Sequence, residues 1–190
     1  MVPSHVARPA QPRVVLALGS NLGDRRDHLL RARRALAAAG LRPLAASPVV
    51  ETDPVGGPPG QPRYLNQVVS CPVGAAPAPR ALLALCLAIE RAHGRVRRER
   101  WAARTLDIDL LFFGDRVVDE PGLVIPHPRL ADRRFVLEPL VALHPELVHP
   151  VLGLTARELL ARLGEPGGDR VQSPASPRRG RDAAEPGRHG

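Results

Sequence analysis

Lysine is absent from this sequence of 190 residues, so all 27 side chains counted as Lys or Arg are arginines. A phosphate-binding loop of the Walker A type needs its lysine, and Schiff-base or pyridoxal chemistry needs a lysine amine. The sequence therefore excludes these classes of site. Any phosphate that this protein binds must be held by arginine, histidine, backbone N–H groups or a metal ion.

Long apolar segments are also missing. The longest helix-like apolar run, residues 81–89, is far shorter than the roughly 20 residues that cross a bilayer, and residues 1–5 lack the apolar core of a signal peptide. Only two cysteines occur, Cys71 and Cys86, both within apolar segments. We expect buried thiols in a reducing compartment, and therefore a cytoplasmic protein without a membrane partner.

Acidic residues are in the minority, and the formal net charge is +8. Residues 91–104 alone hold six arginines and one glutamate. A basic protein often binds nucleic acid. Here the excess charge is focused in one short segment of a chain rich in Ala, Arg, Pro and Gly, so we do not take the net charge as evidence of a nucleic-acid partner.

The length and the apolar content of 44% suit one domain with a real core. Residues 1–12 and 164–190 are rich in proline, glycine and charge, and we expect them to be disordered tails around a domain at 13–163. Residues 53–63 hold four prolines and three glycines and are predicted to form a loop.

Alternating and helical patterns predict the elements of this domain. Strands are expected at 13–18, 64–73 and 105–113, with residues 41–52 also favouring β structure. One helix is expected between Asp24 and Gly40, a second from Pro79, and shorter helices at 132–143 and 155–163. A tight turn at residues 114–115 would lead into a hairpin. This order is the split βαβ pattern of an α+β ferredoxin-like sandwich, with a mainly antiparallel sheet and helices packed on one face.

The sharpest local feature is the segment Thr105-Leu-Asp-Ile-Asp-Leu110. Side chains alternate along a strand, so Asp107 and Asp109 would share one face, about 7 Å apart, while the leucines and Ile108 face the core. Two neighbouring carboxylates repel unless a cation joins them, and Mg²⁺ prefers such oxygen ligands together with substrate phosphates. The alternative is a solvated strand face with two incidental acids, because a D-x-D motif alone is weakly specific.

The arginine-rich segment 95–104 leads directly into this strand. Arginines beside paired carboxylates suit a site that holds a polyphosphate with its metal, although most charged runs are only solvated loops. Aromatic side chains are scarce, yet Tyr64, Trp101 and Phe135 all lie at or beside expected loops. Tyr64 with Asn66 offers an aromatic face and an amide for a flat heterocycle. His127 is a candidate phosphate ligand, with a structural histidine as the alternative.

These motifs resemble those of the 6-hydroxymethyl-7,8-dihydropterin pyrophosphokinase family of folate biosynthesis. The resemblance covers about residues 13–154 and includes Leu18-Gly-Ser-Asn-Leu-Gly-Asp24, Tyr64-Leu-Asn66, Pro126-His-Pro-Arg129 and, most specifically, Arg100-Trp-Ala-Ala-Arg-Thr-Leu-Asp-Ile-Asp109. It implies a ferredoxin-like enzyme that transfers the β,γ-diphosphate of ATP to the hydroxymethyl group of the pterin and releases AMP. It also implies two magnesium ions.

The resemblance implies a role for particular residues. Asp107 and Asp109 would be the magnesium ligands, and Arg95 and Arg104 would lie along the phosphates and stabilise the transition state. The pterin would lie between Tyr64 and Phe135, with Asn66 at its edge and the backbone of residues 52–56 beside it, which includes Thr52, Val55 and Gly56. The ATP site would also draw on Glu90, Arg97, Trp101, His127 and Arg133. Loops 53–63 and 94–103 are placed to close over both substrates, and we expect a monomer.

One alternative from another class is a basic RNA-binding module, because ferredoxin-like sheets also serve as RNA platforms. No RNP-type aromatic pattern appears on an expected strand. Asp107 and Asp109 would moreover place negative charge on the open sheet face. A pterin-binding protein without catalysis is a third reading, and the presence of both arginines and both aspartates argues against it.

Overall fold

The computed structural model describes residues 12–94 and 103–164. The elements follow one another as β1 (Arg13–Ser20), α1 (Arg25–Ala38), β2 (Ala45–Ala46), β3 (Val50–Thr52), β4 (Tyr64–Pro72), the 3-10 turn η1 (Val73–Ala75), α2 (Pro79–Ala92), β5 (Asp107–Phe113), β6 (Val118–Glu120), β7 (Leu123–Ile125), α3 (Arg134–Leu143) and α4 (Ala156–Arg162). The three long strands and all four helices lie where the sequence predicts them, apart from small differences at their ends.

The main sheet is antiparallel throughout, with the order β2-β4-β1-β5 and with β3 also paired to β4. The first and last long strands along the chain, β1 and β5, are therefore neighbours, and β4 lies on the other side of β1. With α1 and α2 as the two crossovers, this is the ferredoxin-like arrangement that the sequence predicts.

Local chemistry fixes the ends of the helices. The Asp24 side chain accepts a hydrogen bond from the Asp27 N–H and caps α1, and Pro79 occupies the first turn of α2, where its missing N–H is not needed. Thr155 and Glu158 form a reciprocal capping box at α4. Each helix begins within two residues of its predicted start.

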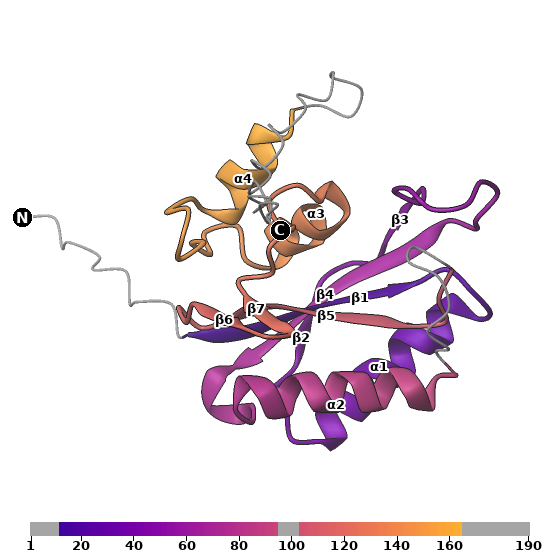
Figure 1. Cartoon of the computed structure of the whole chain (residues 1–190), viewed down its shortest axis with the longest axis horizontal. Coiled ribbons are helices and arrows are strands. Elements are labelled where there is room, and N and C mark those ends of the chain that lie inside the picture. Colours follow the sequence, from indigo (N-terminus) through magenta and orange to yellow (C-terminus); the bar gives the residue numbers. More distant parts are fainter. Residues whose placement is uncertain (1–11, 95–102, 165–190) are drawn as a thin grey trace, which may run out of the picture.

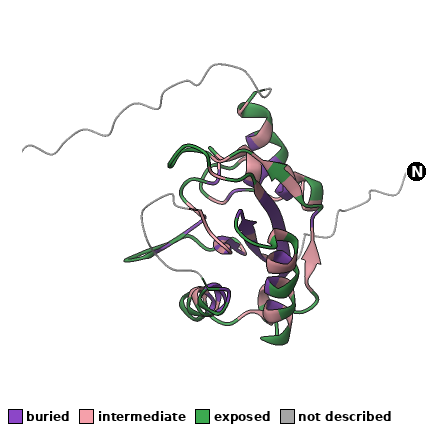
Figure 2. Cartoon of the chain, turned by 90° about the vertical axis from the view of Figure 1, so that its right-hand side faces the viewer, coloured by how far each residue is buried: buried purple, intermediate pink, exposed green. Residues whose placement is uncertain are grey.

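Both faces of the sheet are covered, which differs from the prediction of helices on one face. The first core cluster joins α1 and α2 to one face through residues such as Leu29 and Cys86. The second joins α3 and α4 to the other face, where Leu137 and Leu159 pack with Val15, Val68 and Phe112. Figure 1 shows the sheet between these two layers, and Figure 2 shows the buried residues concentrated on the strands and on the inward sides of the helices.

The turn at residues 114–115 and the hairpin after it are present as predicted. In this hairpin β6 pairs with β7 in a separate two-stranded sheet. Cys71 and Cys86 are buried and free, as expected. Among the described helices, none is long and apolar enough to cross a membrane. Apart from Pro12 and Gly164, the expected tails lie outside the described residues, as do residues 95–102 of the arginine-rich segment.

Candidate active site

A pocket of about 220 Å³ lies on the sheet face that carries α3. The register explains its floor, because Gly19 of β1 pairs with Asn66 of β4 on one side and with Asp107 of β5 on the other. Alternation along β5 then places Asp109 on the same face as Asp107. The walls of the pocket are formed by the 53–63 loop, by the segment before α3 and by the first turn of α3.

The two aspartates meet two arginines at one end of this pocket. The Arg104 Nη1 donates to Asp107 Oδ2 at 2.6 Å, and the Arg133 Nη1 donates to Asp109 Oδ2 at 3.0 Å. Burial lowers the pKa of Arg104, but the nearby Asp107, with smaller contributions from Tyr64 and Asp109, holds that pKa above its ordinary value. A charged Arg104 guanidinium therefore lies where an anionic substrate would meet the carboxylates.

His127 lies close to the carboxylate of Asp109. Its Nε2 lies 3.9 Å from Asp109 Oδ2, while its Nδ1 accepts a hydrogen bond from the Arg129 N–H at 3.2 Å. Because Nδ1 is an acceptor, the neutral ring must carry its proton on Nε2. Burial lowers the pKa of His127 despite the opposing charge of Asp109. The ring thus presents a neutral N–H donor beside Asp109.

Glu90 lies outside the pocket lining. It is buried on α2, and its Oε1 accepts a hydrogen bond from the Ile108 N–H at 2.8 Å. Because Ile108 separates Asp107 from Asp109 in β5, this bond holds the strand from the opposite face. Glu90 thus contacts the backbone between the two aspartates rather than the pocket itself.

The same pocket also carries the residue types that suit a flat heterocycle. Tyr64 begins β4 and Phe135 lies in the first turn of α3, so the two aromatic residues approach from different layers. The Asn66 Nδ2 donates to Thr52 Oγ1 at 2.8 Å, which fixes the orientation of the amide. The pocket lining contains all six residues predicted for the pterin, namely Thr52, Val55, Gly56, Tyr64, Asn66 and Phe135.

Some predicted residues cannot be placed. Arg95, Arg97 and Trp101 lie outside the described residues. Other lining residues were given no role by the sequence, namely Asp53, Gln61, Arg129 and Asp132. Asn21 belongs to the Gly-Ser-Asn motif, yet only the structure shows that its Oδ1 accepts the Arg104 N–H at 2.7 Å and its Nδ2 donates to the Pro62 carbonyl at 3.2 Å.

Asp107 and Asp109 fit a magnesium site by their chemistry. They supply hard oxygen ligands from one strand face, and Mg²⁺ commonly takes one or two carboxylates and completes its shell with substrate phosphates and water. Within 12–94 and 103–164, no group of three or more His, Cys, Asp or Glu side chains could hold a metal by itself. A metal at this pair would therefore need ligands from a bound substrate or from water.

One pocket on a ferredoxin-like scaffold thus contains aromatic side chains together with arginines and carboxylates. This combination defines a small-molecule site of the kind found in enzymes that transfer phosphate groups to a ring-bearing substrate. Residues 15–145 match the family described as 7,8-dihydro-6-hydroxymethylpterin-pyrophosphokinase, HPPK. The chain belongs to this family.

Two curated relatives match this chain over most of their own length. A protein of Methylorubrum extorquens is 42% identical over 161 residues, which cover 84% of this chain and 99% of the relative. A protein of Pseudomonas aeruginosa is 43% identical over 150 residues, which cover 78% of this chain and 90% of the relative. Both are named 2-amino-4-hydroxy-6-hydroxymethyldihydropteridine pyrophosphokinase.

Solved structures support the fold. A Plasmodium falciparum HPPK-DHPS triple mutant with STZ-DHP superposes with a TM-score of 0.62 at 17% identity, and the match covers 80% of this chain and 43% of that chain. The wild-type protein with SDX-DHP gives a TM-score of 0.61 at 17% identity, covering 80% and 44%. The chain thus spans less than half of these longer proteins.

Proposed function

We propose that this protein transfers the β,γ-diphosphate of ATP to the hydroxymethyl group of 6-hydroxymethyl-7,8-dihydropterin, with release of AMP. The hydroxyl oxygen attacks the β-phosphorus, the bond from that phosphorus to the oxygen bridging it to the α-phosphate breaks, and the product is the pterin diphosphate. This is a diphosphotransferase step of folate biosynthesis. Family membership and the names of the relatives support the proposal.

The observation that carries the proposal is that Tyr64, Asn66 and Phe135 line the same pocket as Arg104, Asp107 and Asp109. We take the first three residues as its aromatic end, for the pterin, and the last three as its charged end, for the phosphates. A pterin bound at the aromatic end would direct its hydroxymethyl group toward the charged end. The distance between ring and phosphate is then set by the sheet, because Gly19 lies between Asn66 and Asp107 in the register.

At the charged end, arginine is the main contribution of the chain itself. Charge on the transferred group spreads over phosphate oxygens in the transition state, and a fixed guanidinium stabilises it without reorganisation. We assign this role to Arg104, and by the resemblance also to Arg95. His127 and Arg133 would hold the nucleotide phosphates, with Arg97 and Trp101 contributing from the neighbouring segment.

We assign Asp107 and Asp109 as the ligands of two Mg²⁺ ions that enter with ATP. When bound, magnesium would neutralise phosphate charge and orient the polyphosphate. Glu90 would act indirectly, because the hydrogen bond that it accepts from the Ile108 N–H fixes the strand between the two ligands. Removing magnesium with EDTA should therefore stop AMP release, and adding magnesium back should restore it.

At the aromatic end, the residues bind and orient the pterin. Tyr64 and Phe135 would stack on its two faces, the Asn66 amide would meet its polar edge, and the backbone around Thr52, Val55 and Gly56 would line its side. Excluding water matters here, because an accessible β-phosphorus would be hydrolysed. We infer that the 53–63 loop, which lines the pocket, closes over the substrates.

We extend the proposal to the setting of the enzyme. We infer one catalytic domain at 13–163 with tails at 1–12 and 164–190, and a monomer, because a single chain supplies the whole described pocket. Cytoplasmic placement is supported by the two free, buried thiols.

The deciding experiment measures AMP release from ATP with and without 6-hydroxymethyl-7,8-dihydropterin at fixed magnesium. We expect AMP only with the pterin, one per pterin diphosphate formed. AMP that forms equally without the pterin, or none from folded protein, would contradict the proposal. The RNA-binding alternative is not supported by the comparisons, and α3 and α4 cover part of the sheet face that an RNA platform would use.

A further inference from the structure

The 53–63 loop is the connection of a hairpin whose two ends both line the pterin end of the pocket. Thr52 at the end of β3 pairs with Tyr64 at the start of β4. The loop between them contributes Asp53, Pro54, Val55, Gly56 and Gln61 to the lining. Its glycines at 56, 57 and 60 all have positive φ, so the loop interior has backbone that few other residues would adopt. The two ends of the loop are its connections to the sheet, and they lie beside the residues that line the pocket.

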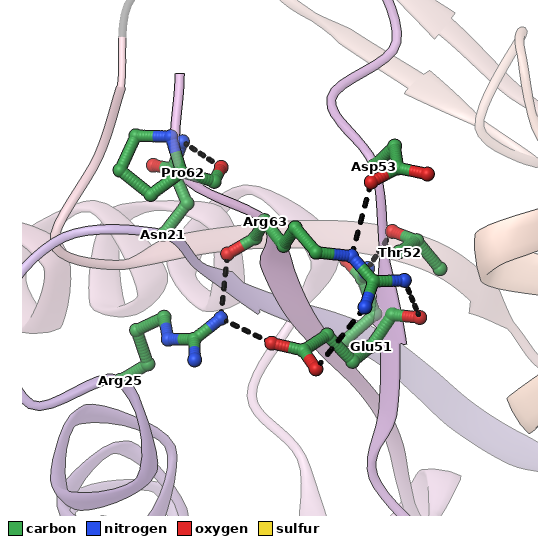
Figure 3. Close-up of polar contacts among 8 residues, drawn as sticks. Asn21, Arg25, Glu51, Thr52, Asp53, Pro62 and Arg63 are labelled. Atoms are coloured by element: carbon green, nitrogen blue, oxygen red, sulfur yellow. Dashed lines mark hydrogen bonds and ion pairs between the residues drawn. The ribbon is translucent and has the colours of Figure 1, made fainter. Parts of the chain in front are cut away.

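The side chain of Arg63, the last loop residue, bridges the two ends of the loop. Its Nε donates to Asp53 Oδ1 at 3.0 Å, and its Nη1 donates to Glu51 Oε2 at 3.4 Å. Figure 3 shows the guanidinium between the two carboxylates. One side chain thus joins the end of the loop to its first residue and to the strand before it.

Arg25 ties the same hairpin to the first turn of α1. Its Nη1 donates to Glu51 Oε1 at 2.7 Å and to the Arg63 carbonyl oxygen at 2.7 Å. The hydrogen bond from Arg25 lowers the pKa of Glu51, so the carboxylate stays charged at neutral pH. Arg63 therefore joins the two sides of the hairpin, and Arg25 joins the hairpin to α1 (Figure 3).

We propose that Arg63 is a positioning residue for the pterin, acting through Asp53 and Glu51 to hold the loop in its binding geometry. This inference rests on the proposed function. The Arg63 and Asp53 side chains are 53% and 82% exposed, and exposed ion pairs add little to global stability. We call the contacts of Arg63 with Asp53 and Glu51 the clamp. Loss of the clamp should therefore change the affinity for the pterin rather than the stability of the fold.

The test compares the full-length protein with Arg63→Gln, Asp53→Asn and the double variant. Pterin affinity is measured by titration with magnesium and α,β-methylene-ATP, which resists cleavage at the bond that breaks. We expect Arg63→Gln to weaken pterin binding by about fivefold, a typical size for losing a small charge network. The double variant should lose no more than the worse single variant, because both changes remove one interaction.

The salt dependence of pterin affinity is a second readout. It would not differ between the wild-type protein and Arg63→Gln if Arg63 only stabilised the fold. The pterin carries no net charge, while exposed ion pairs are screened by salt. Raising NaCl should weaken pterin binding to the wild-type protein and leave Arg63→Gln almost unchanged. The matched control is Arg157→Gln, which removes another exposed arginine, one that pairs with Glu146 outside the pocket lining. It should bind the pterin like the wild-type protein.

The outcomes separate this inference from the proposed function. A wild-type protein that binds no pterin and releases no pterin-dependent AMP overturns the proposed function. If the wild-type protein binds the pterin and the Arg63 and Asp53 variants bind it equally well, only the inference about the clamp is overturned. Additive losses in the double variant would also overturn it, and Asp53→Asn keeps the test valid if Arg63→Gln does not fold.

Discussion

Asn21 and Arg104 hold each other by two hydrogen bonds across 83 positions of sequence. The Arg104 N–H donates to Asn21 Oδ1 at 2.7 Å, and the Asn21 N–H donates to the Arg104 carbonyl oxygen at 3.0 Å. Asn21 is only 1% exposed, so its side chain is fixed in place. The backbone of Arg104 is therefore held independently of its own side chain.

The first prediction follows from this independence. Arg104→Ala should remove the guanidinium without moving the backbone, and it should lower kcat by about a hundredfold or more because transition-state charge loses its partner. KM for ATP should change much less. Single-turnover rates measured with saturating ATP and pterin check this. A variant that changes only KM would contradict the catalytic role of Arg104.

The second prediction concerns the aspartate pair. Asp107→Asn and Asp109→Asn keep the side-chain shape but remove the charge that a magnesium ligand needs, so each should lower AMP release by at least about a hundredfold. Thermal unfolding should change little, because Arg104 and Arg133 are partly exposed and remain hydrated. Activity of either variant within tenfold of the wild-type protein would contradict the assignment.

Local patterns predicted the placement of these aspartates on one strand face. Alternation alone placed Asp107 and Asp109 on one face of β5, and the capping residue Asp24 marked the start of α1. Such features depend on a few neighbouring residues, and the sequence contains all of them. The ferredoxin-like order of elements was likewise readable, because each long strand and helix has its own period.

Features that depend on distant partners were not predicted. The periodicity of α3 and α4 shows that each has an apolar side, but not which sheet face it covers, and the second layer was missed. The turn at residues 114–115 does not say that the hairpin after it forms a separate sheet. The contacts of Arg63 with Glu51 and Asp53 were also missed, because charges scattered around a Pro/Gly loop have no preferred partner until the hairpin register is known.

The third prediction concerns pH. Burial lowers the pKa of His93, His127, His144 and His149 below the ordinary value of 6.5. As the pH falls through 6.5, the unfolded chain binds protons at these positions before the folded chain does, so the free energy of unfolding should decrease. Urea unfolding between about pH 7.5 and 5 measures this slope. A stability that stays constant or rises on acidification would contradict it.

The effect should be separable from that of carboxylates. Glu51 and Glu158 also have lowered pKa values, but their stabilising contribution is lost only as the pH falls below their ordinary value of 4.5. His144→Gln removes one titrating ring, whose Nε2 lies 2.7 Å from Ser70 Oγ. This variant should show a shallower decrease between pH 7.5 and 5.

The last prediction concerns Gly19 on the pocket floor. A methyl group there would lie 3.4 Å from Asn66 Oδ1 and 3.9 Å from both the Asp107 Cβ and the Tyr64 Cδ1. These are ordinary contacts, so Gly19→Ala should fold normally and could gain about 0.4–1 kcal/mol through the unfolded chain. The methyl group would nevertheless occupy space between the two ends of the pocket. We expect KM for the pterin to rise by about tenfold.

Gly74→Ala is the matched control, because an added methyl group there meets nothing within 4 Å and Gly74 lies outside the pocket lining. Thermal unfolding and steady-state kinetics of both variants, measured side by side, separate the fold from the site. Stability kept by both, with pterin KM raised only by Gly19→Ala, would locate the pterin over the junction of β4, β1 and β5. An unchanged KM in Gly19→Ala would mean that the substrate binds away from this floor, and the assignment of Asn66 to its edge would then be wrong.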